Sequence, residues 1–169
     1  SLLAILCYLK CLSCNPFNSS QSHKEVVQLH ETNSEYRDFW NRFNGGKKPA
    51  DTPEWYESDL FWDEVIRSIP NLRKVYLTGG EPTLIERNYK FMQACIESGH
   101  AKNIFLMFNI NCTNVQDKFL EYLPHFQFVL INASIDGLEQ ENEYIRFLSR
   151  WETIDKNFRK LVKLPSNVQ

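Results

Sequence analysis

Short apolar stretches alternate with amphipathic stretches over most of this chain, and this alternation limits the folds available to it. Each apolar stretch has the length of a buried strand, and a polar turn and a helical pattern follow three of them. Strands and helices alternating at this spacing are typical of right-handed βαβ units around a parallel sheet. We therefore expect an α/β fold with about four β/α units. The expected strands are residues 2–6, 72–77, 103–108 and 126–132, and the expected helices after the last three are 85–98, 115–122 and 151–164.

The segment between the first two strands is longer than the other connections. A polar loop is expected over residues 7–21, with Pro16 in a turn, and a partly helical pattern over 25–43 is interrupted near 32–34. Residues 44–53 form a loop too short to separate two domains, and Ser58 is positioned to cap a helix that Pro70 ends. We expect a single domain spanning residues 1–169.

Composition excludes several classes of partner. The formal net charge is −2 and the pI is about 6.1, so there is no electrostatic argument for binding nucleic acid or an anionic membrane. No apolar run approaches the roughly 20 residues that span a bilayer. The first six residues lack a basic segment before them, and Leu6 occupies the place of a small cleavage-site residue, so a secretion signal is not expected. We expect a cytoplasmic chain trimmed at its N-terminus.

Three of the five cysteines lie within eight residues, directly after the first expected strand. Cys7, Cys11 and Cys14 have the spacing C-x3-C-x2-C, and three thiolates on one loop can bind one face of a [4Fe–4S] cluster. The fourth iron would stay open to a small molecule. Structural zinc is the alternative, but it prefers four protein ligands, and His23 and His30 fit no familiar zinc spacing. The remaining alternative is that three cysteines lie in this loop without binding a metal, but clustered loop cysteines are unusual.

A second motif follows the second expected strand. Gly79 and Gly80 allow a close approach of the backbone to a ligand, Glu81 adds a carboxylate, and Pro82 stiffens the exit into the next helix. Carbonyl oxygens and the Glu81 carboxylate could hold the amino group of a ligand. Alternatively, the glycines only satisfy the geometry of a βα turn.

Together, the cysteine spacing after the first strand and the Gly-Gly-Glu-Pro turn after the second resemble the radical S-adenosylmethionine (SAM) superfamily. Residues 14–20 (CNPFNSS) and the run from Asn142 to Trp151 are similar to one branch, whose members carry a C-terminal twitch domain. The resemblance covers nearly the whole chain. It implies a partial, TIM-like (β/α)6 barrel that is truncated here, so that residues 1–169 are a radical SAM core without its last strands and without the twitch domain.

The resemblance also implies a role for each motif residue. All of these residues follow the C-terminal ends of strands, where α/β barrels place their active sites. Cys7, Cys11 and Cys14 would ligate the cluster; Gly79, Gly80, Glu81 and Pro82 would hold the amino group of SAM; Asn111 would lie near SAM; and Ser134 and Asp136 would contact its ribose. Two positions depart from the family pattern, Ser13 where an aromatic residue is common and Tyr8 where this branch favours Asn.

The implied activity is reductive cleavage of SAM. An external donor of flavodoxin or ferredoxin type would supply one electron through the cluster, giving methionine and a 5′-deoxyadenosyl radical that abstracts hydrogen from a peptide or small-molecule substrate. A non-catalytic iron–sulfur or SAM-binding module, or a truncated scaffold, is the alternative, and a zinc-binding structural domain is a third possibility. Cys95 and Cys112 are expected to be packing residues, whereas Tyr144, Arg146 and Trp151 could line a substrate pocket or belong to the core.

Overall fold

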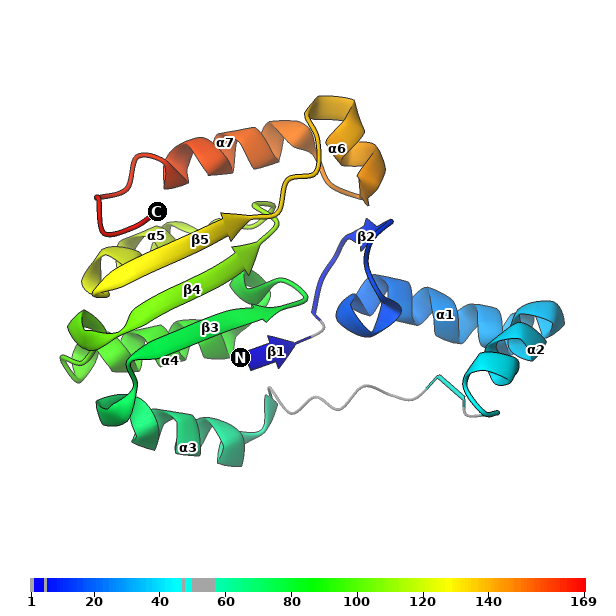
Figure 1. Cartoon of the computed structure of the whole chain (residues 1–169), viewed down its shortest axis with the longest axis horizontal. Helices are drawn as coiled ribbons and strands as arrows, with labels where there is room; N and C mark the ends of the chain where they lie inside the picture. The colour runs from blue at the N-terminus through cyan, green and yellow to red at the C-terminus, as the bar shows by residue number, and fades with distance from the viewer. Residues whose placement is uncertain (1, 5, 47, 50–56) are drawn as a thin grey trace.

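A four-stranded parallel sheet forms the centre of the computed structural model, which describes residues 2–4, 6–46, 48–49 and 57–169 (Figure 1). The strands lie side by side in the order of the chain, and neighbours are parallel. The expected α/β class is confirmed. The strands of this sheet are β1 (Leu2–Ala4), β3 (Lys74–Gly79), β4 (Phe105–Ile110) and β5 (Phe128–Ala133).

The last three strands begin two residues later than the sequence predicts. Each is preceded by a single 3-10 turn, over Ile69–Asn71, Ala101–Asn103 and Leu123–His125 respectively. Each of these turns contributes a buried apolar residue to the core, namely Ile69, Ala101 and Leu123. In each case the apolar segment of the sequence begins in the turn, before the backbone becomes extended, so the sequence places the start of the strand too early.

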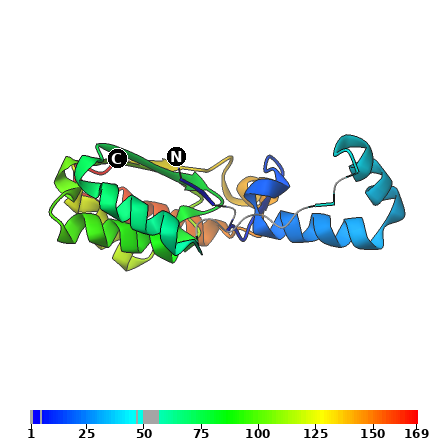
Figure 2. The same ribbon diagram turned by 90° about the horizontal axis from the view of Figure 1, so that it is seen from below.

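Helices cover one face of the sheet, and in the described residues no helix covers the other face (Figure 2). The covering helices are α3 (Asp59–Ser68), α4 (Glu86–Glu97), α5 (Asp117–Tyr122) and α7 (Trp151–Leu161). α1 (Ser20–Thr32) projects away from the sheet, and α2 (Ser34–Phe43) follows at its far end after a sharp bend (Figure 1). α6 (Glu139–Ile145), which the sequence did not predict, precedes α7.

Local signals in the sequence explain several helix boundaries. The expected interruption near residues 32–34 is the break between α1 and α2, where the Asn33 side chain accepts a hydrogen bond from the Tyr36 N–H at 2.9 Å. Ser58 caps α3 as expected, accepting from the Phe61 N–H at 3.4 Å. Part of the expected loop 44–53, namely residues 47 and 50–53, lies outside the described residues, as does residue 5 in the first expected strand.

The hydrophobic core lies between the sheet and its helices. Alternate strand residues such as Leu77, Leu106 and Phe108 are at most 1% exposed and point toward the helices. The Phe108 ring meets Phe119 of α5 edge-on, with 5.1 Å between ring centroids. Every helix among the described residues is too short or too polar to cross a membrane.

The C-terminal residues extend the sheet. Val168 forms a parallel bridge with Val129, and the Gln169 carbonyl accepts a hydrogen bond from the Ile131 N–H at 2.6 Å. Residues 167–169 therefore lie beside β5, on the side away from β4. The strands form an open sheet, because no closed barrel is present among the described residues.

Candidate functional site

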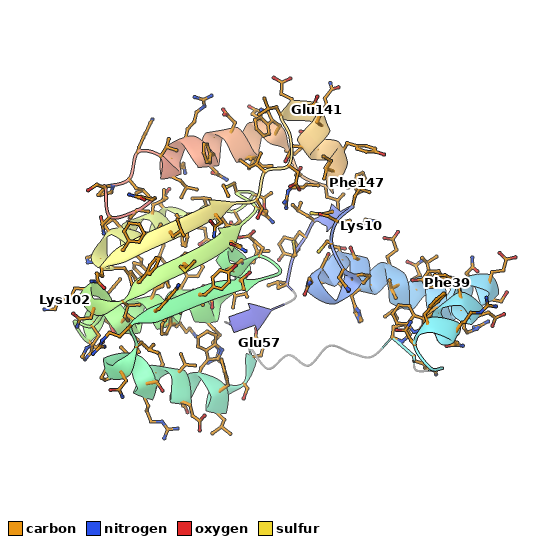
Figure 3. The ribbon with its side chains drawn as sticks, viewed as in Figure 1. Lys10, Phe39, Glu57, Lys102, Glu141 and Phe147 are labelled. Atoms are coloured by element: carbon orange, nitrogen blue, oxygen red, sulfur yellow. The ribbon has the colours of Figure 1, made fainter. Side chains whose placement is uncertain are left out.

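A small second sheet holds the middle of the cysteine loop. β2 (Lys10–Cys11) pairs antiparallel with β6 (Arg146–Phe147), so that Cys11 lies opposite Arg146 and Lys10 opposite Phe147. Figure 3 shows Lys10 and Phe147 side by side, and the Lys10 ammonium lies 5.6 Å from the Phe147 ring centroid. The sequence contains no signal for this pairing, because two-residue strands have no periodicity to detect.

The first turn of α1 anchors the rest of the loop. The Ser19 hydroxyl donates to the Leu9 carbonyl at 2.7 Å, and the Ser20 hydroxyl donates to the Cys7 carbonyl at 2.8 Å. Ser19 is also the N-cap of α1, accepting from the Ser22 N–H at 3.2 Å. Two serines before a helical pattern indicate a helix N-terminus. This signal was not used above, where the helical pattern is expected to begin at residue 25.

The three cysteines line one cavity of about 270 Å³ at the C-terminal edge of the parallel sheet. Its lining contains seven of the ten site residues that the sequence predicted, together with Arg146, which the sequence indicated as a possible pocket residue, and Asn18, Thr78 and Asn109, which had no expected role. The seven predicted lining residues are Cys7, Cys11, Cys14, Gly79, Gly80, Asn111 and Ser134. Glu81, Pro82 and Asp136 are absent from the lining.

The cysteine sulfurs share this cavity without forming a preassembled metal site. Among the described residues, no three His, Cys, Asp or Glu side chains are spaced as ligands of one metal ion. Nevertheless, the donor set fits an iron–sulfur cluster better than a hard cation, because three thiols line the cavity and no carboxylate of the described residues does.

Two nitrogen donors approach the cysteine sulfurs. Asn111 Nδ2 lies 3.8 Å from Cys7 Sγ, and Arg146 Nη1 lies 3.8 Å from Cys11 Sγ. Contacts of this kind stabilise negative charge on sulfur and tune thiolate-ligated metals. The surroundings of two of the three sulfurs thus favour an anionic group in the cavity.

Burial has the opposite effect on the free thiols. It raises the pKa of Cys7 to about 11 and also raises the pKa of Cys11 and Cys14, while the charge of Arg146 partly counteracts the increase for the last two. At neutral pH the metal-free thiols are therefore protonated. Binding of a thiophilic metal group must release these protons.

Gly79 is required by its backbone conformation. Its φ of 107° lies in the region that L-amino acids with a side chain rarely adopt. The residue ends β3, pairs with Ala4 of β1 and lies in the cavity wall. Geometry alone thus accounts for the first glycine of the motif, and the same conformation presents bare backbone to the cavity.

The Glu81 carboxylate is fully engaged by the protein. The side chain is 1% exposed; Oε1 accepts from the Thr83 N–H and O–H at 3.3 and 2.6 Å, and Oε2 accepts from the Asn111 N–H at 2.7 Å. Burial raises its pKa to about 7 despite these hydrogen bonds. Pro82 is also buried, and its carbonyl accepts a hydrogen bond from Asn88 Nδ2 at 2.9 Å. A ligand in the cavity would therefore meet the backbone of the glycines, not the Glu81 carboxylate.

Asp136 contacts the site through Arg146. Its carboxylate lies 2.8 Å from Arg146 Nη2, while the Arg146 Nε is buried and has no hydrogen-bond partner among the described residues. Ser134 reaches the cavity because its N–H donates to the Ile110 carbonyl at 2.7 Å and so holds the end of β5 beside the end of β4. The expected substrate-pocket role of Arg146 is thus consistent with its position in the lining.

The remaining cysteines belong to the core. Cys95 and Cys112 are both 0% exposed, and burial raises the pKa of each to about 12. The expectation that they are packing residues is confirmed. Cys112 has a positive φ of 60°, and its carbonyl accepts from Asn157 of α7 at 2.9 Å.

No protein-family model matches the chain, and no curated protein is significantly similar to it. A proposal about its function therefore depends on the residues of the cavity and on the motifs that brought them to attention.

Proposed function

We propose that this chain is the core of a radical SAM enzyme. The observation that carries the proposal is the position of Cys7, Cys11 and Cys14 in one cavity together with the Gly79–Gly80 turn. In this proposal the three cysteines hold a [4Fe–4S] cluster, and SAM occupies the remaining space. Two further predicted residues, Asn111 and Ser134, line the same cavity.

The arrangement of the sheet supports the barrel that the proposal requires. The strands follow chain order, and the described helices that pack on the sheet lie on one of its faces, as in a singly wound barrel and unlike a doubly wound sheet. Residues 167–169 add the start of a further parallel strand beside β5. We propose that these units are the first part of a (β/α)6 barrel.

The chemistry supplied by such a cluster with bound SAM is one-electron reductive cleavage to methionine and a 5′-deoxyadenosyl radical, which requires an external electron donor of flavodoxin or ferredoxin type. The protein would position the ligands and neutralise charge. Arg146 places a cation beside Cys11, and Asn111 directs an amide toward Cys7. Glu81 fixes Asn111 by accepting its backbone N–H, so its role is positioning.

The first experiment is anaerobic iron–sulfur reconstitution, followed by addition of dithionite and SAM and detection of 5′-deoxyadenosine by mass spectrometry. We expect product from the wild-type chain and from a Cys95→Ala control, because Cys95 lies in the core. The Cys7/Cys11/Cys14 triple Ala variant should lose both bound iron and product.

The other outcomes separate the alternatives. A fully loaded, brown protein that forms no 5′-deoxyadenosine would identify a non-catalytic iron–sulfur module. A colourless protein with one zinc per chain would instead identify a structural zinc domain. Full cluster absorbance in a Cys11→Ala variant would exclude Cys11 as a ligand.

A further inference from the structure

The helix-free face of the parallel sheet carries three rows of side chains. These are the strand residues that alternate with the buried ones, and they are partly or fully exposed. From the N-terminal to the C-terminal ends of the strands, the rows are Lys74, Phe105 and Phe128; then Tyr76, Met107 and Leu130; then Asn109 and Asn132.

The rows change from apolar to polar toward the cysteine cavity. At the far end, the Lys74 ammonium lies 5.2 Å from the Phe105 ring centroid, and the Phe105 and Phe128 rings meet edge-on at 5.2 Å. Met107 and Leu130 form an uncharged apolar middle. The formal positive charge of this face is therefore distant from the asparagine row.

A hydrogen-bonded chain links the middle row to the polar row. Asn109 Nδ2 donates to Tyr76 Oη at 2.5 Å, and Asn132 Nδ2 donates to Asn109 Oδ1 at 2.9 Å. Among the described residues, the Tyr76 hydroxyl proton and the side-chain Oδ1 of Asn132 have no hydrogen-bond partner. The hydrogen-bonded series Tyr76–Asn109–Asn132 thus offers a ligand one donor at Tyr76 and one acceptor at Asn132.

The polar row is continuous with the cavity. Asn109 lines the same cavity as Cys7 and Cys11, and it is also the central member of the Tyr76–Asn109–Asn132 chain. A molecule lying on the sheet and bonded to this chain would therefore have one end at the cavity and its body over Met107 and Leu130.

We infer that the helix-free face binds the substrate of the proposed enzyme, and that this substrate is an uncharged molecule with an amide beside an apolar group. An amide both donates and accepts, so it matches the available Asn132 oxygen and Tyr76 hydroxyl. A carboxylate or phosphate at the asparagine row would lose water without gaining a cation, because Arg146 is paired with Asp136 and Lys74 lies at the opposite ends of the strands. The inference rests on the proposed function for the role of the bound molecule, but binding itself does not require a cluster or SAM.

The test uses the full chain without iron or SAM and the probe N-acetyl-L-leucine methylamide, followed by two-dimensional NMR of side-chain amides and methyl groups. We expect saturable shifts of the Asn109, Asn132 and Met107 signals. Asn132→Ala and Tyr76→Phe should each weaken binding about five- to tenfold, the effect of losing one hydrogen bond. The matched control, Asn103→Ala, lies at the opposite end of the sheet in an exposed 3-10 turn and should bind as the wild type does.

Several results would overturn the inference. They are the absence of saturable shifts up to the solubility limit of the probe, equal or tighter binding of the carboxylate N-acetyl-L-leucine, and wild-type affinity in both Asn132→Ala and Tyr76→Phe. Tyr76→Phe keeps the ring, so it remains informative if the asparagine variant folds poorly. The NMR readout needs no cluster, so the two proposals can fail separately. Probe binding without 5′-deoxyadenosine formation would refute the proposed function alone. Formation of 5′-deoxyadenosine without probe binding would refute this inference alone.

Discussion

Arg146 Nη1 lies 3.8 Å from Cys11 Sγ although 135 positions separate the two residues in the chain. The β2–β6 pairing places their backbones directly opposite each other, and Asp136 holds the other end of the guanidinium at 2.8 Å. The contact therefore depends on main-chain pairing as well as on charge. It makes the region after β5 part of the environment of the cysteine loop.

Replacing Arg146 should raise the pKa of the Cys11 thiol. Burial already raises this pKa, and both the charge and the hydrogen bond of Arg146 lower it. In Arg146→Gln we expect the pH of half-maximal alkylation by iodoacetamide to move upward in the metal-free chain. Arg159→Gln is the control, because Arg159 is exposed on α7 and pairs with Asp155. An unchanged midpoint would contradict the coupling, even if a looser loop changed the plateau rate.

The five cysteines should separate into reactive and unreactive groups. Cys11 and Cys14 are partly exposed, Cys7 is 7% exposed, and Cys95 and Cys112 are 0% exposed with a pKa of about 12. Pulse alkylation of the native chain at pH 8, with peptide mass spectrometry, should label Cys11 and Cys14 first. Cys95 and Cys112 should react only after unfolding, and their early labelling would show that the core is open in solution.

Glu81 should make stability depend on pH in a specific window. Its folded-state pKa is raised by burial from 4.5 to about 7, so between these values the folded chain retains a proton that the unfolded chain has released. The free energy of unfolding therefore falls as pH rises through this window, and Glu81→Gln should lose this contribution to the slope. Urea unfolding at several pH values measures it.

The Glu81 variant also has a structural consequence. Gln offers one acceptor oxygen where the carboxylate accepts on both, from Thr83 and from the Asn111 N–H, so one buried donor loses its partner. A loss of about 1–3 kcal/mol is expected for such a donor. Glu121→Gln, at an exposed position of α5, should change neither the slope nor the stability. If it reproduces either effect, the assignment to Glu81 fails.

Phe119 should be a major contributor to stability. It is 1% exposed, and its ring meets Phe108 at 5.1 Å and Tyr89 at 6.4 Å between centroids. Phe119→Ala should lower the free energy of unfolding by about 3–5 kcal/mol, the range for truncating a buried phenylalanine. Phe158→Ala, at a 38% exposed position in α7, should cost much less. Similar losses in both variants would mean that α5 does not pack as described.

Much of the fold was predictable because its signals are local. The apolar run at residues 104–108 indicates a strand, and Asn33 and Ser58 indicate helix boundaries through hydrogen bonds to nearby backbone groups. The parallel order of the strands follows from the lengths of the helices between them. The exact strand starts were missed because the preceding 3-10 turns are equally apolar.

The sequence by itself determined which residues deserve attention at the site: the cysteine triplet, the Gly79–Gly80 turn and the polar residues after later strands. Only the tertiary structure decided their orientation. It turned the Glu81 carboxylate away from the cavity toward Asn111, and it brought Arg146 to Cys11 through two short strands. The physical reason is that spacing along a chain reports local conformation. Contacts between distant residues depend instead on how separate elements pack, and burial there sets which polar groups are satisfied by the protein and which remain for a ligand.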